Sequence, residues 1–231
     1  MTLVSIIPSS AITTLYLSKL SCSKIGIMKK GLLIVYSGPS GVGKSTILAE
    51  VLKQDDLKLS FSVSMTTREP REGEEEGVDY FYVDKETFEK AIEEDKFLEY
   101  ATYVGNYYGT PRDFVEQKRN EGRNVMLEID VQGGLQVMEK CPEAVTIFIE
   151  PPSLEVLKER LIGRGTDPLD VIEQRVSRAT GEIEKSVTYK YHVINDVLEV
   201  AVEEVIAIIR KEMEDLEDEY YEEEGYIGVT E

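Results

Sequence analysis

Residues 38–45 read GPSGVGKS and fill every position of the P-loop pattern. They follow an apolar run, residues 32–36, which predicts a buried strand. A glycine-rich turn between a strand and a helix directs backbone N–H groups at an anion. Lys44 can then reach the β- and γ-phosphates of a nucleotide, and the Ser45 hydroxyl can hold Mg²⁺. The alternative is an ordinary glycine-rich turn, but the complete motif behind a predicted strand favours a phosphate site.

A second candidate site lies in the charged stretch after residue 62, where the spacing is S-x-T-T-R-x-x-R-x-x-E with a tyrosine six residues on. Arg68 and Arg71 are three residues apart and can form a multidentate clamp on a phosphate dianion. Tyr80 and Tyr108 can add hydroxyl donors to the same phosphate. A solvated charged loop is the alternative, since exposed ion pairs contribute little stability.

The composition restricts the class of protein. The chain has 231 residues, 42% of them hydrophobic, and a net charge of −19, so it can bury a sizeable core and offers no basic stripe for nucleic acid. Cys22 and Cys141 are far apart and fit neither a disulfide framework nor a metal site, which is typical of the reducing cytoplasm. The single histidine, His192, is expected to occupy a strand position.

Both ends of the chain differ from its middle. Residues 1–27 contain no Asp or Glu and lack both a basic signal-peptide region and a membrane span, so we expect a leader outside the fold, which begins near Met28. It is either a disordered segment or an unused upstream start; a transit peptide is disfavoured because arginine is absent. Residues 212–231 hold ten acidic and no basic side chains, and we expect a solvated tail whose beginning is helical.

The elements that must position these residues alternate between strand and helix. Strands are expected at residues 32–36, 59–64, 125–129, 145–149 and 191–194, and helices at 44–54, after Pro111, up to Lys140, after Ser153, at 169–185 and from 198 onward. This alternation predicts an α/β fold with a parallel β-sheet core flanked by helices. Residues 62–109 depart from it, with expected strands at 79–83 and 97–104, and are interpreted as a small inserted α+β domain.

The chain resembles guanylate kinase from Met28 to about Arg210. The resemblance rests on GPSGVGKST, SVSMTTREPREGEEEGVDYFYV, FLEYATYVGNYYGTP, LEIDVQGG, PPSLEVLKERLIGRGT and INDVLEVA. It implies a P-loop nucleoside monophosphate kinase with a core of residues 28–61 and 110–211, a GMP-binding insert of 62–109 and a mobile lid of about 163–190. Tyr82 stands where the family usually has phenylalanine, and we expect it to lie away from the chemistry.

The resemblance implies transfer of the γ-phosphoryl group of ATP to GMP or dGMP, with Mg²⁺ at Ser45. The ATP-binding residues that it implies are Gly38, Pro39, Ser40, Gly41, Val42, Gly43, Lys44, Ser45, Thr46 and Asn195. The GMP-binding residues are Ser64, Arg68, Arg71, Glu74, Tyr80, Glu99, Tyr108, Thr110, Glu128 and Asp130. The residues expected to neutralise the transferred charge are Lys44, Arg68, Arg160, Arg164 and Arg175.

The chemistry of guanine agrees with two carboxylates at its edge. Guanine presents N1–H and N2–H₂ as neighbouring donors, and a carboxylate offers matching acceptors, so Glu99 and Asp130 are expected to determine base specificity. Glu99 can alternatively be a surface acid on an edge strand. Glu128 shares a strand face with Asp130 and is expected near the metal's water shell. Arg160 can instead be a cation that favours a helix C-terminus.

Two alternatives for the activity remain open at this point. Another nucleoside monophosphate kinase is disfavoured by the two carboxylates. A guanylate-kinase-like interaction module without catalysis is disfavoured because Lys44 and Ser45 complete an intact P-loop. Substrates are therefore expected to be small nucleotides, ATP with GMP or dGMP, with no nucleic acid and no membrane, and protein partners stay open.

Overall fold

The computed structural model describes residues 29–165 and 167–223, so the leader at residues 1–27 lies outside the described part. Its centre is a five-stranded parallel sheet in the order β2-β7-β1-β8-β9. The strands are β1 (Leu33–Ser37), β2 (Leu59–Phe61), β7 (Asn124–Glu128), β8 (Val145–Glu150) and β9 (Tyr191–Ile194). The predicted fold class, a parallel core sheet flanked by helices, is confirmed.

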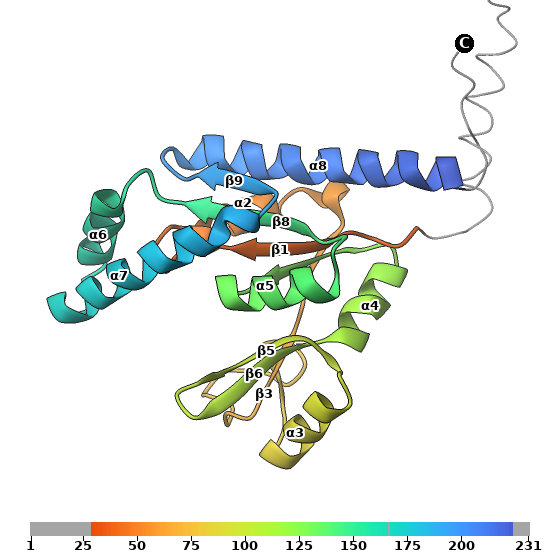
Figure 1. Ribbon diagram of the computed structural model, residues 1–231, viewed down its shortest axis with the longest axis horizontal. Helices are drawn as coiled ribbons and strands as arrows, with labels where there is room; N and C mark the ends of the chain where they lie inside the picture. The colour runs from red at the N-terminus through yellow and green to blue at the C-terminus, as the bar shows by residue number, and fades with distance from the viewer. Residues whose placement is uncertain (1–28, 166, 224–231) are drawn as a thin grey trace, which may run out of the picture.

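Helices cover both faces of this sheet. In Figure 1, α8 (Leu198–Glu223) lies above the sheet and α5 (Val131–Lys140) below it. Alternate strand residues point to opposite faces, so Ile34 packs with α8 and α2 (Lys44–Val51), whereas Val35 packs with α5 and α4 (Arg112–Asn120). This two-sided burial explains why residues 32–36 are an uninterrupted apolar run.

A second sheet lies below the core in Figure 1. It has four strands in the order β4-β3-β6-β5: β3 (Ser64–Thr66), β4 (Tyr80–Tyr82), β5 (Phe97–Tyr103) and β6 (Asn106–Pro111). The helix α3 (Lys85–Glu93) begins at Asp84, whose side chain accepts a hydrogen bond from the Thr87 N–H. From α3, Phe88 stacks on Phe97 and forms a separate small core with the sheet. The opposite face of the sheet is not covered by α3.

Two helices lie beyond the carboxyl ends of β1 and β8, to which the arrows point in Figure 1: α6 (Leu154–Gly163) and α7 (Leu169–Lys185). Ser153 caps α6 as predicted, because its Oγ accepts from the Val156 N–H. Short 3₁₀ turns, η1 (Asp55–Leu57) and η2 (Ser186–Thr188), complete the elements. None of the helices in the described ranges is long and apolar enough to cross a membrane.

Three predicted boundaries were wrong. The strand expected at residues 59–64 is two strands, because β2 pairs with β7 in the core while β3 pairs with β4 and β6 in the second sheet. The helix expected to reach residue 54 ends at Val51, where the chain tightens into i→i+3 bonds. Pro111 is the N-cap of α4 rather than its first helical residue, since it is still the last residue of β6 and pairs there with Phe97 of β5.

The last helix runs without a break across residue 212, where the acidic tail was expected to begin. Glu212 is buried, and Met213 and Leu216 pack against the core. The first turns of the acidic segment therefore belong to the packed helix.

Candidate functional site

The P-loop connects β1 to α2, and two of its glycines are required by both conformation and space. Gly41 and Gly43 have φ of 94° and 98°, a region that side chains rarely adopt. A Cβ at Gly43 would lie 2.5 Å from Asn195 Nδ2, and one at Gly41 would lie 2.7 Å from Leu161 Cδ2. Gly43 is also the N-cap of α2 and supplies no side-chain cap. The first N–H groups of α2 thus remain available for an anion.

Lys44 and Ser45 open α2 beside an acidic residue of the sheet. The Lys44 Nζ donates to Gly38 O at 2.6 Å and to Pro39 O at 3.2 Å. Burial lowers the pKa of Lys44, while the nearby Glu128 carboxylate acts in the opposite direction. The Ser45 hydroxyl donates to Glu128 Oε1 at 3.4 Å. The Lys44 ammonium group and the side-chain oxygens of Ser45 and Glu128 therefore lie close together at the start of α2.

A cavity of about 710 Å³ extends from the P-loop to α7. Its walls combine cations with acids from several elements. They are Gly38, Ser40, Gly41, Gly43, Lys44, Ser45, Thr46, Tyr103, Glu128, Ile129, Asp130, Arg164, Val171, Gln174, Arg175, Arg178 and Glu182. We call this cavity the cleft.

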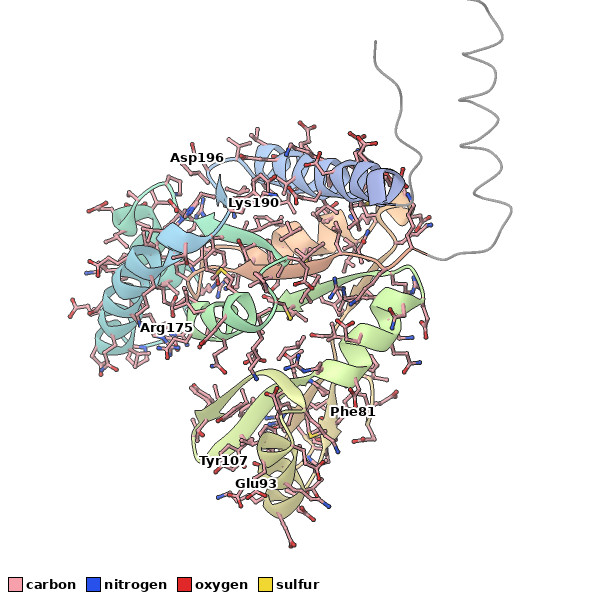
Figure 2. The ribbon with its side chains drawn as sticks, turned by 45° about the vertical axis from the view of Figure 1, so that its right-hand side comes forward. Phe81, Glu93, Tyr107, Arg175, Lys190 and Asp196 are labelled. Carbon is pink, nitrogen blue, oxygen red and sulfur yellow. The ribbon has the colours of Figure 1, made fainter. Side chains whose placement is uncertain are left out.

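The arginines predicted from the lid side lie around the P-loop. Arg175 Nη1 donates to Ser40 Oγ at 3.1 Å, and Arg175 is also paired with Asp167. Arg160 Nη1 lies 3.5 Å from Val42 O, and Arg164 lines the cleft. Figure 2 labels Arg175 on α7. These side chains reach the loop from α6, α7 and their connection.

The side chain of Asn195 is hydrogen-bonded to the backbone of the P-loop. Its side chain is buried, and its Nδ2 donates to Val42 O at 2.7 Å. It also lines a second cavity of about 370 Å³ next to the loop, with Arg160 and Asp196 among its neighbours. The amide therefore fixes the loop as well as facing a space next to it.

The predicted acceptor residues share one face of the second sheet. Register pairs Ser64 with Tyr80 and Glu99 with Thr110, and directly paired residues point the same way. Tyr108 is two residues before Thr110 and points to this face as well. Sequence spacing alone does not reveal this convergence, because it depends on how four strands are paired.

The two arginines of the proposed clamp are organised by Glu74. Arg68 Nη2 donates to Glu74 Oε1 at 2.9 Å, and the Arg71 backbone N–H donates to Glu74 Oε2 at 2.8 Å. These two bonds lower the pKa of Glu74 to about 2. The guanidinium of Arg68 also lies 5.3 Å from the centre of the Tyr80 ring. Arg68 is held in place, whereas the backbone of Arg71 is fixed and its side chain is exposed.

The expectation that Tyr82 lies away from this chemistry was wrong. Its hydroxyl donates to Glu74 Oε2 at 2.8 Å, and its ring centre lies 6.0 Å from the Arg68 guanidinium. Partial burial and the bond to Glu74 raise the pKa of Tyr82 to about 12, so the phenol keeps its proton. Tyr80 and Tyr82 alternate along β4 and therefore share one strand face, a signal that would have placed Tyr82 beside Tyr80.

The two carboxylates predicted to read a base meet at the N-terminus of α5. Glu99 is 7% exposed, and its Oε1 accepts from Thr110 Oγ1 at 2.5 Å. Burial raises the pKa of Glu99, and Asp130 adds to this rise. Asp130 caps α5 by accepting from the N–H groups of Gln132 and Gly133. A Cβ at Gly133 would lie 3.0 Å from Glu99 Oε2, so Gly133 lets both carboxylates approach the same helix end.

The structure separates the predicted residues into two groups. Glu128 and Asp130 line the cleft with the P-loop. Asp130 also lies at the end of α5 that Glu99 approaches. Arg68 lies in the loop after β3 and Tyr80 lies on β4, and neither is among the described residues that line the cleft. In Figure 2, Tyr107 and Phe81 mark this sheet, at a distance from Arg175. Arg68 therefore stands on the acceptor side and apart from Lys44.

Sequence reasoning missed several residues of the cleft. Tyr103 reaches it from the tip of β5, and α7 contributes Val171, Gln174, Arg178 and Glu182. The α7 residues repeat at spacings of three and four on the face that also carries Arg175, which a helical projection would have identified. Tyr103 lies four residues after Glu99 on β5 and therefore on the same strand face. The alternation of side chains along a strand would have placed it beside the site.

Comparison with known proteins gives one consistent result. The guanylate kinase family model matches residues 30–212. The guanylate kinase of Listeria innocua is 51% identical over 184 residues, which cover 80% of this chain and 90% of that protein. That of Bacillus anthracis is 52% identical over 181 residues, covering 78% and 88%. The crystal structure of guanylate kinase from Anaplasma phagocytophilum is similar with a TM-score of 0.61 and 34% identity, covering 80% and 87%.

Proposed function

The chain belongs to the guanylate kinase family and phosphorylates GMP with ATP, and we propose that the cleft and the second sheet divide this reaction between donor and acceptor. Neither another nucleoside monophosphate kinase nor a non-catalytic module is favoured. In this proposal residues 28–61 and 110–211 form the core, residues 62–109 bind GMP, and about 163–190 act as the lid. The separate sheet and separate small core of the insert support this division.

On the acceptor side, we assign guanine to Glu99 and Asp130. Glu99 can accept from N1–H and from one hydrogen of the exocyclic amine. Its Oε1 also accepts a hydrogen bond from Thr110 Oγ1, which holds the carboxylate in place. Adenine has an acceptor at N1 and would leave this buried carboxylate unpaired. Ser64 lies on the same sheet face as Glu99, next to the base.

The GMP phosphate is assigned to Arg68 and Arg71, with hydroxyl donors from Tyr80 and Tyr108. The held orientation of Arg68 supports this assignment, because a preorganised guanidinium loses little freedom on binding a phosphate. Glu74 is not a phosphate ligand in this proposal. It aligns Arg68 and remains ionised, as its pKa of about 2 requires.

On the donor side, the P-loop and the first turn of α2, residues 38–46, hold the ATP phosphates. Lys44 exchanges its bonds to Gly38 O and Pro39 O for phosphate oxygens, and Arg160, Arg164 and Arg175 neutralise charge from the lid side. We place the adenine near Asn195, beside the second cavity. The GMP phosphate is already an anionic nucleophile, so the reaction requires no dedicated general base.

The residues present fit a magnesium ion, although no group of three acidic, Cys or His side chains that could hold a metal occurs in the described ranges. Ser45 and Glu128 provide neighbouring oxygen atoms, the ligand type that Mg²⁺ prefers, and phosphates and water complete such sites. When bound, the ion neutralises phosphate charge. We assign Ser45 as its direct protein ligand and Glu128 to its water shell. We also propose a cytoplasmic location, where ATP and GMP are available.

The observation that carries the acceptor assignment is the meeting of Glu99 and Asp130 at Gly133. The test is an ATP-dependent panel of GMP, AMP, CMP and UMP, followed by ADP release. We expect GMP to exceed the others in kcat/KM by roughly 10⁴-fold. Faster turnover of any other monophosphate would refute the assignment of the base.

A further inference from the structure

Arg178 lines the cleft, and the function proposed above assigns it no role. It lies on α7, one turn after Arg175, and its side chain is 61% exposed. Its Nε donates to Glu182 Oε1 at 3.0 Å, and its Nη2 lies 3.5 Å from Asp130 Oδ2. Glu182 is only 14% exposed and orients the guanidinium from the same helix. Arg178 thus bridges α7 to the cap of α5.

The two oxygens of Asp130 have different partners. Oδ1 accepts from Gln132 N at 3.0 Å and from Gly133 N at 2.9 Å, so it belongs to the helix cap. Oδ2 is the oxygen that remains for a ligand, and Arg178 is its neighbour. A carboxylate oxygen has two lone pairs and can accept from Arg178 and from a ligand donor together.

Guanine has a donor that suits this oxygen. Its exocyclic amine carries two hydrogens, and Glu99 can take only one of them together with N1–H. The second hydrogen points away from Glu99 and needs another acceptor. Asp130 approaches the same end of α5 as Glu99, on the other side of Gly133.

We propose that Arg178 is a positioning residue that holds Asp130 Oδ2 toward the exocyclic amine of guanine. The inference rests on the proposed assignment of Asp130 to the base. It also gives α7 a contact with each nucleotide site, because Arg175 on the preceding turn donates to Ser40 of the P-loop. Lid position and base recognition are thereby coupled through one helix.

IMP is the probe for this inference, because it has the charge and shape of GMP but lacks the exocyclic amine. We would measure kcat/KM for GMP and for IMP at saturating ATP with the full chain, Arg178→Gln and Arg178→Lys. Loss of an exposed ion pair is expected to lower the GMP/IMP ratio about fivefold in Arg178→Gln. Arg178→Lys is expected to restore most of it.

The matched control is Lys185→Gln, which removes an exposed cation from the same helix outside the cleft and should keep the wild-type ratio. An unchanged GMP/IMP ratio in Arg178→Gln overturns the inference. Equal losses for both nucleotides also overturn it, because they assign Arg178 to the phosphate or to the fold. If the wild type itself does not prefer GMP to IMP and AMP, the assignment of the base fails first and the inference falls with it.

Discussion

Replacing Glu99 by glutamine tests two consequences of a buried carboxylate: its recognition of the base and its cost in stability. The substitution keeps the size of the side chain and an oxygen that can accept from Thr110 Oγ1. It removes the negative charge of a residue that is only 7% exposed. Burial raises the pKa of this carboxyl group. An ionised carboxylate in such a position costs stability while the site is empty, and its two acceptors become useful only when a base with two donors arrives.

The expected loss of activity follows from the hydrogen bonds to guanine. An amide at residue 99 offers one acceptor where Glu99 offers two, so one guanine donor faces the amide donor in a buried site. The loss of a charge-assisted bond and the unpaired donors together cost about 3–4 kcal/mol. This corresponds to a decrease of about 10²- to 10³-fold in kcat/KM for GMP.

The expected change in stability has the opposite sign. Removing the buried charge should stabilise the free enzyme by about 1 kcal/mol at neutral pH, which raises Tm by about 2–4 °C for a chain of this length. A carboxyl whose pKa is raised on folding costs nothing below its unfolded pKa, and its cost grows as the pH rises toward the folded value. The difference in Tm between Glu99→Gln and wild type should therefore vanish in acid and be complete at neutral pH.

The assay combines steady-state turnover of GMP with thermal unfolding at acid and neutral pH. Glu93→Gln is the control, because Glu93 is an exposed glutamate of α3, labelled in Figure 2, and loses the same charge at the surface. A kcat/KM for GMP close to wild type would refute the assignment of guanine to Glu99. A Glu99→Gln protein that is less stable than wild type at neutral pH would refute the stated cost of the buried charge.

Three further variants test other parts of the site. Lys44→Ala should lower kcat about 10³-fold while GMP binding, measured by calorimetry, is retained, because its ammonium neutralises the transferred group; Lys53→Ala, an exposed lysine beyond the end of the same helix, is the control. Tyr82→Phe should raise the KM for GMP about threefold with kcat unchanged, since Glu74 loses one hydrogen bond. Val104→Asn should increase the free energy of unfolding in urea by about 1 kcal/mol, because Val104 has φ of 47° and is 80% exposed.

Each of these variants has an outcome that contradicts its premise. Near-normal release of ADP by Lys44→Ala would exclude Lys44 from the transfer. An unchanged KM in Tyr82→Phe would mean that the hydroxyl has no influence on the clamp. A loss of stability in Val104→Asn would show that the valine side chain contributes more than its left-handed backbone costs.

Local signals were sufficient for much of the fold. The helix at residues 169–185 and the strand at 191–194 have the bounds predicted for them, because caps, proline and apolar spacing act within a few residues. The chain between residues 59 and 66 was mispredicted for the opposite reason. Nothing local shows that β2 joins the core sheet and β3 the second sheet, since each strand is defined by a partner far away in the sequence.

By itself, the sequence determined the P-loop, the arginine pair and the presence of carboxylates suited to guanine, because these depend on residue type and short spacing. Tertiary structure alone decided which groups meet. It brought Glu99 and Asp130 to Gly133, linked Tyr82 to the clamp through Glu74, and turned one face of α7 toward the cleft. The physical reason is that hydrogen bonds act over about 3 Å, so their partners are set by strand pairing and helix packing rather than by position along the chain.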